Sequence, residues 1–405
     1  MKKIYLDYAA TTYIDPLVLR KMNPYLTRLF GNPSSLHAAG REVRFAIESA
    51  RLDVAKILNA ESKEIIFTGS GTESDNLAIF GIAMAYKDKG RHIITTKIEH
   101  PAILEAVKKL EKQGFEVTYL NVDSGGLVDL SELKKSLRED TILVSIIYAN
   151  NEIGTIQPIY EISNIIRNFR EESEKRIVKS KNNHSLSTFH FPLFHTDACQ
   201  AAGALELDVK KLGVDLITLN GSKIYGPKGI GCLYASKNAK LEPIIVGGGQ
   251  EGGLRAGTEN AALIIGFSEA LKLAEKLKNK ESKRLRILRD YFIKNILKTI
   301  SHSRLNGHPV KRLPNNINVS IDNIEGEAMA LMLDNYGIYA STGSACSSRK
   351  LTASHVLLAI GISPELAHGS LRFTLGRKTK KEDIDYVLKV LPLIVAKLRK
   401  ISAIK

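Results

Sequence analysis

The middle of the chain, residues 65–234, alternates short apolar runs with stretches of helical periodicity. The apolar runs lie near Ile65, His92, Phe115, Thr141, Phe194, Asp215 and Gly231. A helix between two apolar strands lets both strands run in the same direction, because the helix carries the chain back along the sheet. The sequence therefore predicts an α/β fold in which a mostly parallel sheet is covered by helices on both faces.

One lysine follows directly after one of these runs. Residues 215–231 read DLITLNGSKIYGPKGIG, where DLITL has the composition of a buried strand and Asn220 and Gly221 end it. Lys223 is therefore expected at the carboxyl end of the sheet, where open α/β folds bind their ligands. Desolvation there favours a neutral amine, which can form a Schiff base with a carbonyl. On this stretch alone a solvated loop lysine is the simpler interpretation, because the chain contains 58 Lys and Arg residues.

The preceding apolar run carries an acid. Residues 194–200 read FHTDACQ, so Asp197 and Lys223 can lie on adjacent strands. Pyridoxal phosphate requires a lysine that binds its aldehyde carbon and an acid that keeps its ring nitrogen protonated. Asp197 and Lys223 are a pair of the right chemistry for this coenzyme.

The first apolar run is followed by a candidate phosphate site. After the strand at residues 65–67, residues 69–72 read GSGT and an amphipathic helix begins. Free N–H groups at the start of a helix, together with the Thr72 hydroxyl, suit a dianionic phosphate. No lysine follows the glycines, which excludes a nucleotide P-loop.

With these stretches in place, the chain resembles the cysteine desulfurases of the class V pyridoxal-phosphate aminotransferases. Matching motifs run in order over nearly the whole chain: YLDYAATT, FGNPSSLH, FTGSGTESDN, IEHPA, NNEIG, HTDACQ, KIYGPKGIG, GGGQEGGLRAGTEN, STGSACSS and SLRFTLGRKTKKEDID. Several motifs in the right order are specific, where a single one would be weak. The resemblance implies a fold-type I transferase dependent on pyridoxal phosphate. Its large coenzyme-binding domain would span residues 15–260, and a smaller α+β domain, built from residues 1–14 and 261–405, would carry a catalytic cysteine loop.

The resemblance also implies roles for individual residues. Lys223, Cys346 and His100 would be catalytic, and His100, in IEHPA, would stack on the coenzyme ring. Coenzyme contacts are implied for Lys223, Asp197, Gln200, His100, Gly71, Thr72, Asn151, Asn220, Ser222 and Thr258. Substrate contacts are implied for Asn32, Asn151 and Arg372. Thr258 would touch the phosphate bound by a neighbouring subunit, so the resemblance implies a homodimer.

Simpler interpretations of some of these residues remain open from the sequence alone. His100 precedes Pro101, which is a position typical of a helix cap. Asn150 and Asn151 follow an apolar run, and asparagine is common in left-handed turns. The family usually has serine and histidine where this chain has Asn220 and Ser222, so we expect a weaker hold on the coenzyme phosphate.

Cys346 has a different setting from the other two cysteines. Cys199 and Cys232 lie beside or within strand patterns, where a free cysteine mostly acts as a small apolar residue. Cys346 lies in STGSACSSRKLTASH, and the charges of Arg349 and Lys350 favour its thiolate. The loop alone also fits a structural cysteine, but beside Asp197 and Lys223 the nucleophile is favoured. The resemblance implies that Cys346 takes the sulfur of L-cysteine as a persulfide, leaving L-alanine. A sulfur-acceptor protein, such as an iron–sulfur scaffold or a tRNA-thiolation enzyme, would then receive it.

Composition limits the other classes of function. The net charge is +15, but acids are interleaved in basic stretches such as LKNKESKRLRILRD, which is typical of solvated helix faces. No stable nucleic-acid binding is expected. Three cysteines cannot all pair and show no metal-ligand spacing, which fits a reducing compartment. MKKIYLDYAATT lacks an apolar signal core, and no run approaches about eighteen apolar residues. We therefore expect a cytoplasmic protein with no membrane span and no metal.

Two alternative functions and two local predictions remain. A selenocysteine lyase or related β-lyase would use the same residues, and a weakly active paralogue could act as a scaffold for a partner. Residues 171–193 are predicted to be a surface excursion, with partner docking as an alternative role. Thr379 and Glu382 are predicted to form a capping box at the start of the last helix.

Cys346→Ser is expected to bind the coenzyme and L-cysteine and to remove the Cα proton of the substrate, but to release no sulfur. The reason is that the thiol is needed only after that proton has gone. Sulfide release under a reductant measures the effect. Normal release by this variant would show that Cys346 is not the sulfur acceptor.

Overall fold

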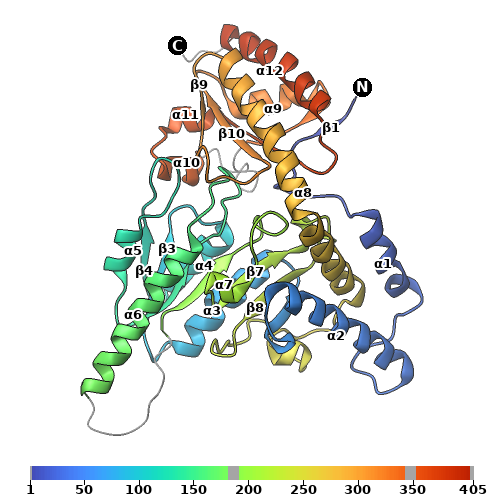
Figure 1. Ribbon diagram of the computed structural model, residues 1–405, viewed down its shortest axis with the longest axis vertical. Helices are drawn as coiled ribbons and strands as arrows, with labels where there is room; N and C mark the ends of the chain where they lie inside the picture. The colour runs from blue at the N-terminus through green and yellow to red at the C-terminus, as the bar shows by residue number, and fades with distance from the viewer. Residues whose placement is uncertain (1, 181–190, 343–352, 402–405) are drawn as a thin grey trace.

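The computed structural model describes residues 2–180, 191–342 and 353–401, and its centre is a seven-stranded sheet (Figure 1). The strand order is β2-β8-β7-β6-β5-β3-β4, with β7, β6, β5, β3 and β4 parallel and β8 antiparallel to both of its neighbours. The bounds are β2 (Ile65–Thr68), β3 (His92–Thr96), β4 (Glu116–Leu120), β5 (Thr141–Ser145), β6 (Leu193–Asp197), β7 (Leu216–Asn220) and β8 (Gly231–Ala235). All seven predicted strands and the mostly parallel sheet are confirmed.

Helices cover both faces of this sheet, which explains why its strands read as apolar runs without alternation. One buried cluster joins the sheet to α3 (Gly71–Tyr86) and α4 (Pro101–Glu111). A second cluster joins the other face to α2 (Ala38–Leu58), α6 (Ile159–Ser180), α7 (Val209–Leu212) and the first half of α8 (Ala261–Thr299). The helix α1 (Pro16–Thr27) packs on α8, and α5 (Leu130–Ser136) lies between β4 and α6.

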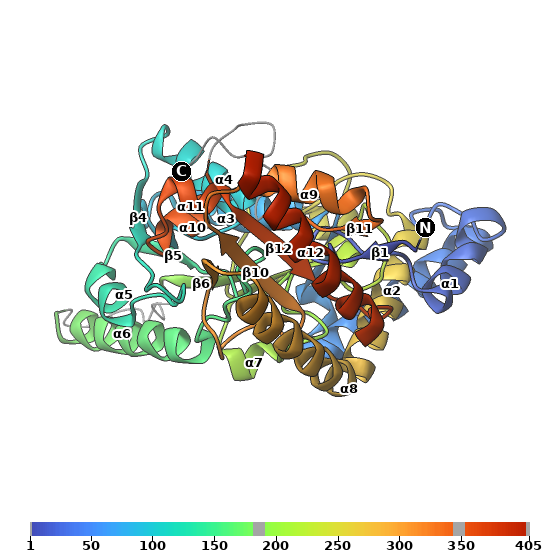
Figure 2. The same ribbon diagram turned by 90° about the horizontal axis from the view of Figure 1, so that it is seen from above.

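A smaller α+β unit follows along the chain. Its antiparallel sheet has the order β12-β10-β9, with β9 (Ser303–Leu305), β10 (Asn316–Ile321) and β12 (Ser370–Thr374). The second half of α8, α9 (Gly326–Asp334) and α12 (Lys381–Ile401) pack on it, and Figure 2 shows α8 and α12 running alongside one another. The N-terminal strand β1 (Ile4–Tyr5) joins this unit by pairing with β11 (Ile338–Tyr339).

The long helix α8 contributes to both apolar cores. Phe267, in its first half, is buried in the core of the large sheet, and Phe292, in its second half, is buried in the core of the small one. A fourth buried cluster joins the loops after β3 and β5 to α10 (His355–Ala359) and α11 (Pro364–His368). The domain division at residues 14 and 260 stays a prediction.

Two local predictions need correction or completion. The capping box of Thr379 and Glu382 is wrong, because the Thr379 hydroxyl accepts from the Gly376 N–H and the Asp383 carboxylate accepts from the Lys380 N–H instead. The predicted excursion at residues 171–193 begins as a continuation of α6 to Ser180, and residues 181–190 lie outside the described part of the chain. Among the described helices, none is long and apolar enough to cross a membrane.

Phe292→Ala is expected to lower the free energy of unfolding by about 3–5 kcal/mol, because it leaves a cavity in the small core. The Phe292 ring is fully buried, with its centroid 5.0 Å from that of Phe373. Urea unfolding of the full chain measures the change. Leu297→Ala, on the exposed side of the same helix, is the control and should change stability by about 0.5 kcal/mol or less. Equal losses from the two variants would contradict this account of the core.

Candidate active site

Lys223 lies just past the carboxyl end of β7. The strand ends at Asn220, whose side-chain oxygen accepts from the Ser222 N–H at 3.0 Å and starts the short helix η2 (Gly221–Lys223). The Lys223 ammonium nitrogen then donates to the Ala10 carbonyl at 2.5 Å. The Thr12 hydroxyl donates to the Ser222 carbonyl at 2.9 Å, so the N-terminal segment crosses the strand ends beside the lysine.

Asp197 is the last residue of β6, the strand parallel to β7. Its side chain is nearly buried, and one carboxylate oxygen accepts from the Cys199 N–H at 2.9 Å. Gln200 lies one turn farther on and donates to the Ala9 carbonyl at 3.0 Å. Gln200 and Lys223 are therefore bound to consecutive carbonyls of the N-terminal segment.

His100 caps the start of α4, as its position before Pro101 predicts. Its Nδ1 accepts from the Ala102 N–H at 3.1 Å, so the proton of the neutral ring is on Nε2. Burial lowers the pKa of His100, the charge of Asp197 opposes this shift, and the charge of Lys223 adds to it. The three side chains are thus electrostatically coupled, which fits a ring-stacking role for His100 beside Asp197 and Lys223.

The first turn of α3 approaches the ends of β6 and β7 closely. A Cβ atom on Gly71 would lie 2.8 Å from the Cys199 sulfur and 3.2 Å from the Asn220 side-chain nitrogen, so only glycine permits this approach. Ser70 caps the helix, and Thr72 is exposed in its first turn. The resulting donors, from the helix N-terminus, Thr72 and Asn220, suit a phosphate. With Lys223 and Asp197 alongside, the residues present fit pyridoxal phosphate.

Arg372 brings the small unit to this site. It is buried in β12, where its guanidinium pairs with Asp7 at 2.8 Å and donates to the Asn151 carbonyl at 3.0 Å. The neighbouring Asn150 is fully buried and donates to the Ile98 carbonyl, so it supports the loop. Arg372 and Asn151 therefore lie together, as their common assignment to the substrate requires.

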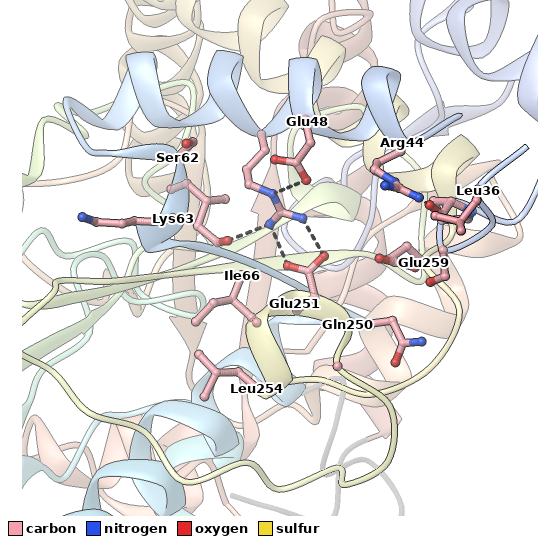
Figure 3. Close-up of a pocket in the computed structure, with 16 residues that line it drawn as sticks. Leu36, Arg44, Glu48, Ser62, Lys63, Ile66, Gln250, Glu251, Leu254 and Glu259 are labelled. Atoms are coloured by element: carbon pink, nitrogen blue, oxygen red, sulfur yellow. Dashed lines mark hydrogen bonds and ion pairs between the residues drawn. The ribbon is translucent and has the colours of Figure 1, made fainter. Parts of the chain in front are cut away.

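Asn32 and Thr258 lie on exposed loops elsewhere. Their neighbours Pro33 and Glu259 line one cavity of about 770 Å³, whose lining residues do not include Lys223 (Figure 3). Within one chain, the structure therefore does not bring these two residues to the lysine.

Cys346 lies outside the described residues, as do Arg349 and Lys350. The chain before this segment is held to the site, because Ser341 and Arg372 exchange two backbone hydrogen bonds. The chain after it is held as well, since the His355 ring nitrogen lies 2.9 Å from the Glu99 carbonyl. Both flanks of the cysteine segment thus start beside residues assigned to the site.

The two described cysteines are free and buried. Burial raises the pKa of Cys199 and of Cys232, with the charge of Asp197 adding to the shift for Cys199. Both thiols are therefore poor nucleophiles, as their strand settings predict.

Comparison with known proteins identifies the family. The aminotransferase class-V family model matches residues 4–172 and 189–387. The chain is 52% identical to cysteine desulfurase IscS of Dictyoglomus turgidum over 100% of this chain and 97% of that protein. It is 48% identical to cysteine desulfurase IscS 1 of Archaeoglobus fulgidus over 98% of each chain. The chain belongs to the cysteine desulfurases of the class-V aminotransferase family.

Comparison with solved structures supports the same family. A NifS-like protein superimposes with a TM-score of 0.85 at 37% identity, covering 98% of this chain and 100% of that one. The protein SspA, solved in complex with cysteine, superimposes with a TM-score of 0.76 at 34% identity, covering 92% and 99% of the two chains. The fold-type I architecture is thereby confirmed.

The desulfurase also places three buried ionisable residues near Asp197 that were not predicted from the sequence. His195 has its ring nitrogens 2.9 Å from the Ser145 hydroxyl and 3.0 Å from the Thr218 hydroxyl, and burial lowers its pKa to about 4. Burial raises the pKa of Glu99 to about 8, and burial together with the charge of Asp197 raises that of Asp75 well above its usual value. Burial thus shifts both carboxyls toward their neutral forms. One sequence signal was present, since His195 precedes Asp197 by two residues and shares its face of β6.

Ser222 occupies a position where the desulfurase departs from the usual family pattern. Its hydroxyl donates to the Asn220 side-chain oxygen at 3.0 Å, so it orders the amide that lies next to Gly71. The Ser222 hydroxyl is therefore a neutral hydrogen-bond donor, and in this structure it donates to Asn220.

Ser222→His is expected to tighten coenzyme binding about fivefold, because a charged imidazole bonded to phosphate is worth about 1 kcal/mol more than a neutral hydroxyl. Dissociation during dialysis, followed by the absorbance of the bound coenzyme, measures the change. Ser222→Ala is the control and should bind more loosely than the native protein. Identical dissociation from the native protein and a correctly folded Ser222→His variant would show that position 222 does not contact the phosphate.

Proposed function

We propose that this desulfurase uses pyridoxal phosphate, held by Lys223, to take sulfur from L-cysteine, giving L-alanine and a persulfide on Cys346. One observation carries the proposal. Lys223 and Asp197 stand at the ends of adjacent parallel strands, and both act on the buried ring of His100. A lysine, an acid and a stacking imidazole are the side chains that this coenzyme requires.

Each of these residues has a defined task. Lys223 would hold the coenzyme aldehyde carbon, and its amine would take the Cα proton of the substrate. Asp197 would keep the ring nitrogen protonated, and His100 would stack on the ring. Gln200 would bond the ring oxygen, and the first turn of α3, with Thr72 and Asn220, would hold the phosphate. When bound, pyridoxal phosphate supplies a ring that accepts the electrons left by the departing proton.

Arg372 holds the substrate carboxylate. A guanidinium forms paired hydrogen bonds with a carboxylate, and its bonds to Asp7 and to the Asn151 carbonyl fix its orientation beforehand. Asn151 assists it, and Asn32 keeps the same role only as the resemblance implies it, because within one chain Asn32 lies away from Lys223. The structural similarity to SspA, which was solved with cysteine, supports L-cysteine as the substrate.

Cys346 is the sulfur acceptor. After the Cα proton has gone, its thiolate attacks the substrate sulfur, the carbon–sulfur bond breaks, and the sulfur stays on Cys346 as a persulfide. The remaining three-carbon unit is protonated and leaves as L-alanine. An acceptor protein, an iron–sulfur scaffold or a tRNA-thiolation enzyme, then takes the sulfur in the cytoplasm. The free thiols of Cys199 and Cys232 support such a reducing compartment.

The enzyme works as a homodimer in which Thr258 reaches the phosphate of the partner subunit. Large apolar side chains that are exposed in the single chain support this, because such exposure marks an interaction surface. They are Phe30, Leu36, Phe45 and Val246, each at least 78% exposed. They lie on or beside α1 and α2 and just before the segment that carries Thr258.

The decisive experiment incubates the purified protein with pyridoxal phosphate and L-cysteine and measures both sulfide and alanine. With a thiol reductant present to release sulfide from the persulfide, equal amounts of the two are expected from a desulfurase without any added partner. A parallel reaction with L-selenocysteine distinguishes a desulfurase from a selenocysteine lyase, which would turn over L-selenocysteine in preference to L-cysteine. No turnover of either substrate would point to a scaffold protein.

Lys223→Ala is expected to abolish both coenzyme attachment and turnover, because it removes the amine opposite Asp197. Borohydride reduction of the native protein followed by peptide mapping identifies the lysine that carries the coenzyme. Lys228→Ala is the matched control, since Lys228 also reaches the N-terminal segment, with its ammonium nitrogen 3.5 Å from the Thr12 carbonyl, and it should keep full activity. Label on a lysine other than Lys223 would overturn the assignment.

A further inference from the structure

A buried ion pair lies against the outer edge of the large sheet. Arg51, in α2, makes two hydrogen bonds to the Glu251 carboxylate, at 2.7 and 2.9 Å. The Glu251 side chain is only 2% exposed and the Arg51 side chain 10%. Glu48 lies on the other side of the same guanidinium, at 3.3 Å, and Figure 3 shows Glu48 and Glu251 facing one another across it. The guanidinium also stacks on Phe67, with its central carbon 4.9 Å from the ring centroid.

This pair takes the place of a neighbouring strand. β2 is the edge strand of the sheet, so one side of its backbone has no strand partner. Arg51 donates to the Ile65 carbonyl at 2.7 Å, and Glu251 accepts from the Phe67 N–H at 2.8 Å. The two side chains therefore satisfy the outer backbone groups of β2, which runs directly into the phosphate loop at residues 69–72.

Glu251 also fixes the glycine-rich segment to which it belongs. It lies in the short helix η3 (Gln250–Gly253) with φ of 49°, a left-handed conformation that is unfavourable for a residue with a side chain. The adjacent Gln250 accepts from the Gly257 N–H at 3.1 Å, which sets the backbone just before Thr258. A single pair thus fixes β2 on one side and residues 250–257 on the other.

A second ion pair joins the same segment to the phosphate loop itself. Arg255 bonds one carboxylate oxygen of Glu73 at 2.9 Å, and the other oxygen accepts from the Gly69 N–H at 2.8 Å. Residues 250–257 are therefore attached both to the strand that leads into the phosphate loop and to the first residue of that loop.

We infer that Arg51 and Glu251 are a positioning pair for the coenzyme phosphate, holding the phosphate loop and the Thr258 segment in one fixed arrangement. Neither Arg51 nor Glu251 is among the residues proposed to contact the coenzyme ring or the substrate. Loss of the pair should therefore weaken the hold on the phosphate and leave the contacts of the ring unchanged. This inference rests on the proposed function, because the ligand of the phosphate loop is part of that proposal.

The test compares pyridoxal phosphate with pyridoxal, which lacks the phosphate. The full chain, stripped of coenzyme, is titrated with each compound for the native protein and for Arg51→Met, which keeps the length of the side chain. We expect Arg51→Met to raise the dissociation constant of pyridoxal phosphate about tenfold and that of pyridoxal less than about twofold. Glu251→Gln keeps the acceptor for the Phe67 N–H, and it should give a smaller change in the same direction. If Arg51→Met does not fold, Glu251→Gln carries the test.

Arg170 provides a matched control. It also forms a partly buried ion pair, with Asp215, and the two side chains bond the Pro192 carbonyl and the Phe194 N–H. These groups lie at the amino ends of β6 and β7. The phosphate loop lies at the opposite edge of the sheet, beside the carboxyl ends of these strands. Arg170→Met should lower the stability of the chain and leave the ratio of the two dissociation constants unchanged.

The outcomes separate the inference from the function on which it rests. An Arg51→Met variant that weakens pyridoxal and pyridoxal phosphate equally, or neither, would overturn the positioning role. A native protein that binds pyridoxal phosphate no better than pyridoxal would instead overturn the proposed phosphate site itself.

Discussion

The meeting of parallel strands at one edge of the sheet is the constraint on which the site depends. β6 and β7 run in the same direction, so their last residues place Asp197 and Lys223 beside each other. Hydrogen-bonding groups at such an edge need partners once the sheet is covered. The N-terminal segment provides them, through the carbonyls of Ala9 and Ala10 and the hydroxyl of Thr12. The first residues of the chain are therefore part of the edge that carries Asp197 and Lys223.

The close approach of α3 is the second requirement. Gly71 allows the first turn of this helix to lie against Cys199 and Asn220, where any side chain would collide. The helix N-terminus is then close to the edge that carries the lysine, and the N–H groups at the start of a helix suit an anion. The phosphate loop depends in turn on the edge strand β2, whose outer backbone groups are bound by Arg51 and Glu251.

The small unit completes the site through charge as well as packing. Arg372 is buried in β12 and pairs with Asp7, which lies just after β1. Because β1 pairs with β11, the N-terminal segment and the small unit are held together where the substrate is proposed to bind. The backbone bonds between Ser341 and Arg372 hold residue 341, which lies shortly before the segment that contains Cys346 in the sequence, at the same point.

The sequence by itself determined the seven strands, their mostly parallel direction, the helix start at His100 and the family. These features depend on residues that are close together in the sequence, or on motifs whose order can be compared directly. The sequence-based prediction was wrong at the start of the last helix. There Asp383, not Glu382, accepts a hydrogen bond from the backbone, so the helix cap lies one residue later than predicted. Only the tertiary structure decided that Asp75 and Glu99 lie close enough to Asp197 to feel its charge, and that Arg51 pairs with Glu251 across 200 residues. Such contacts depend on how helices and strands pack against one another. A local sequence pattern does not show which distant residues will meet.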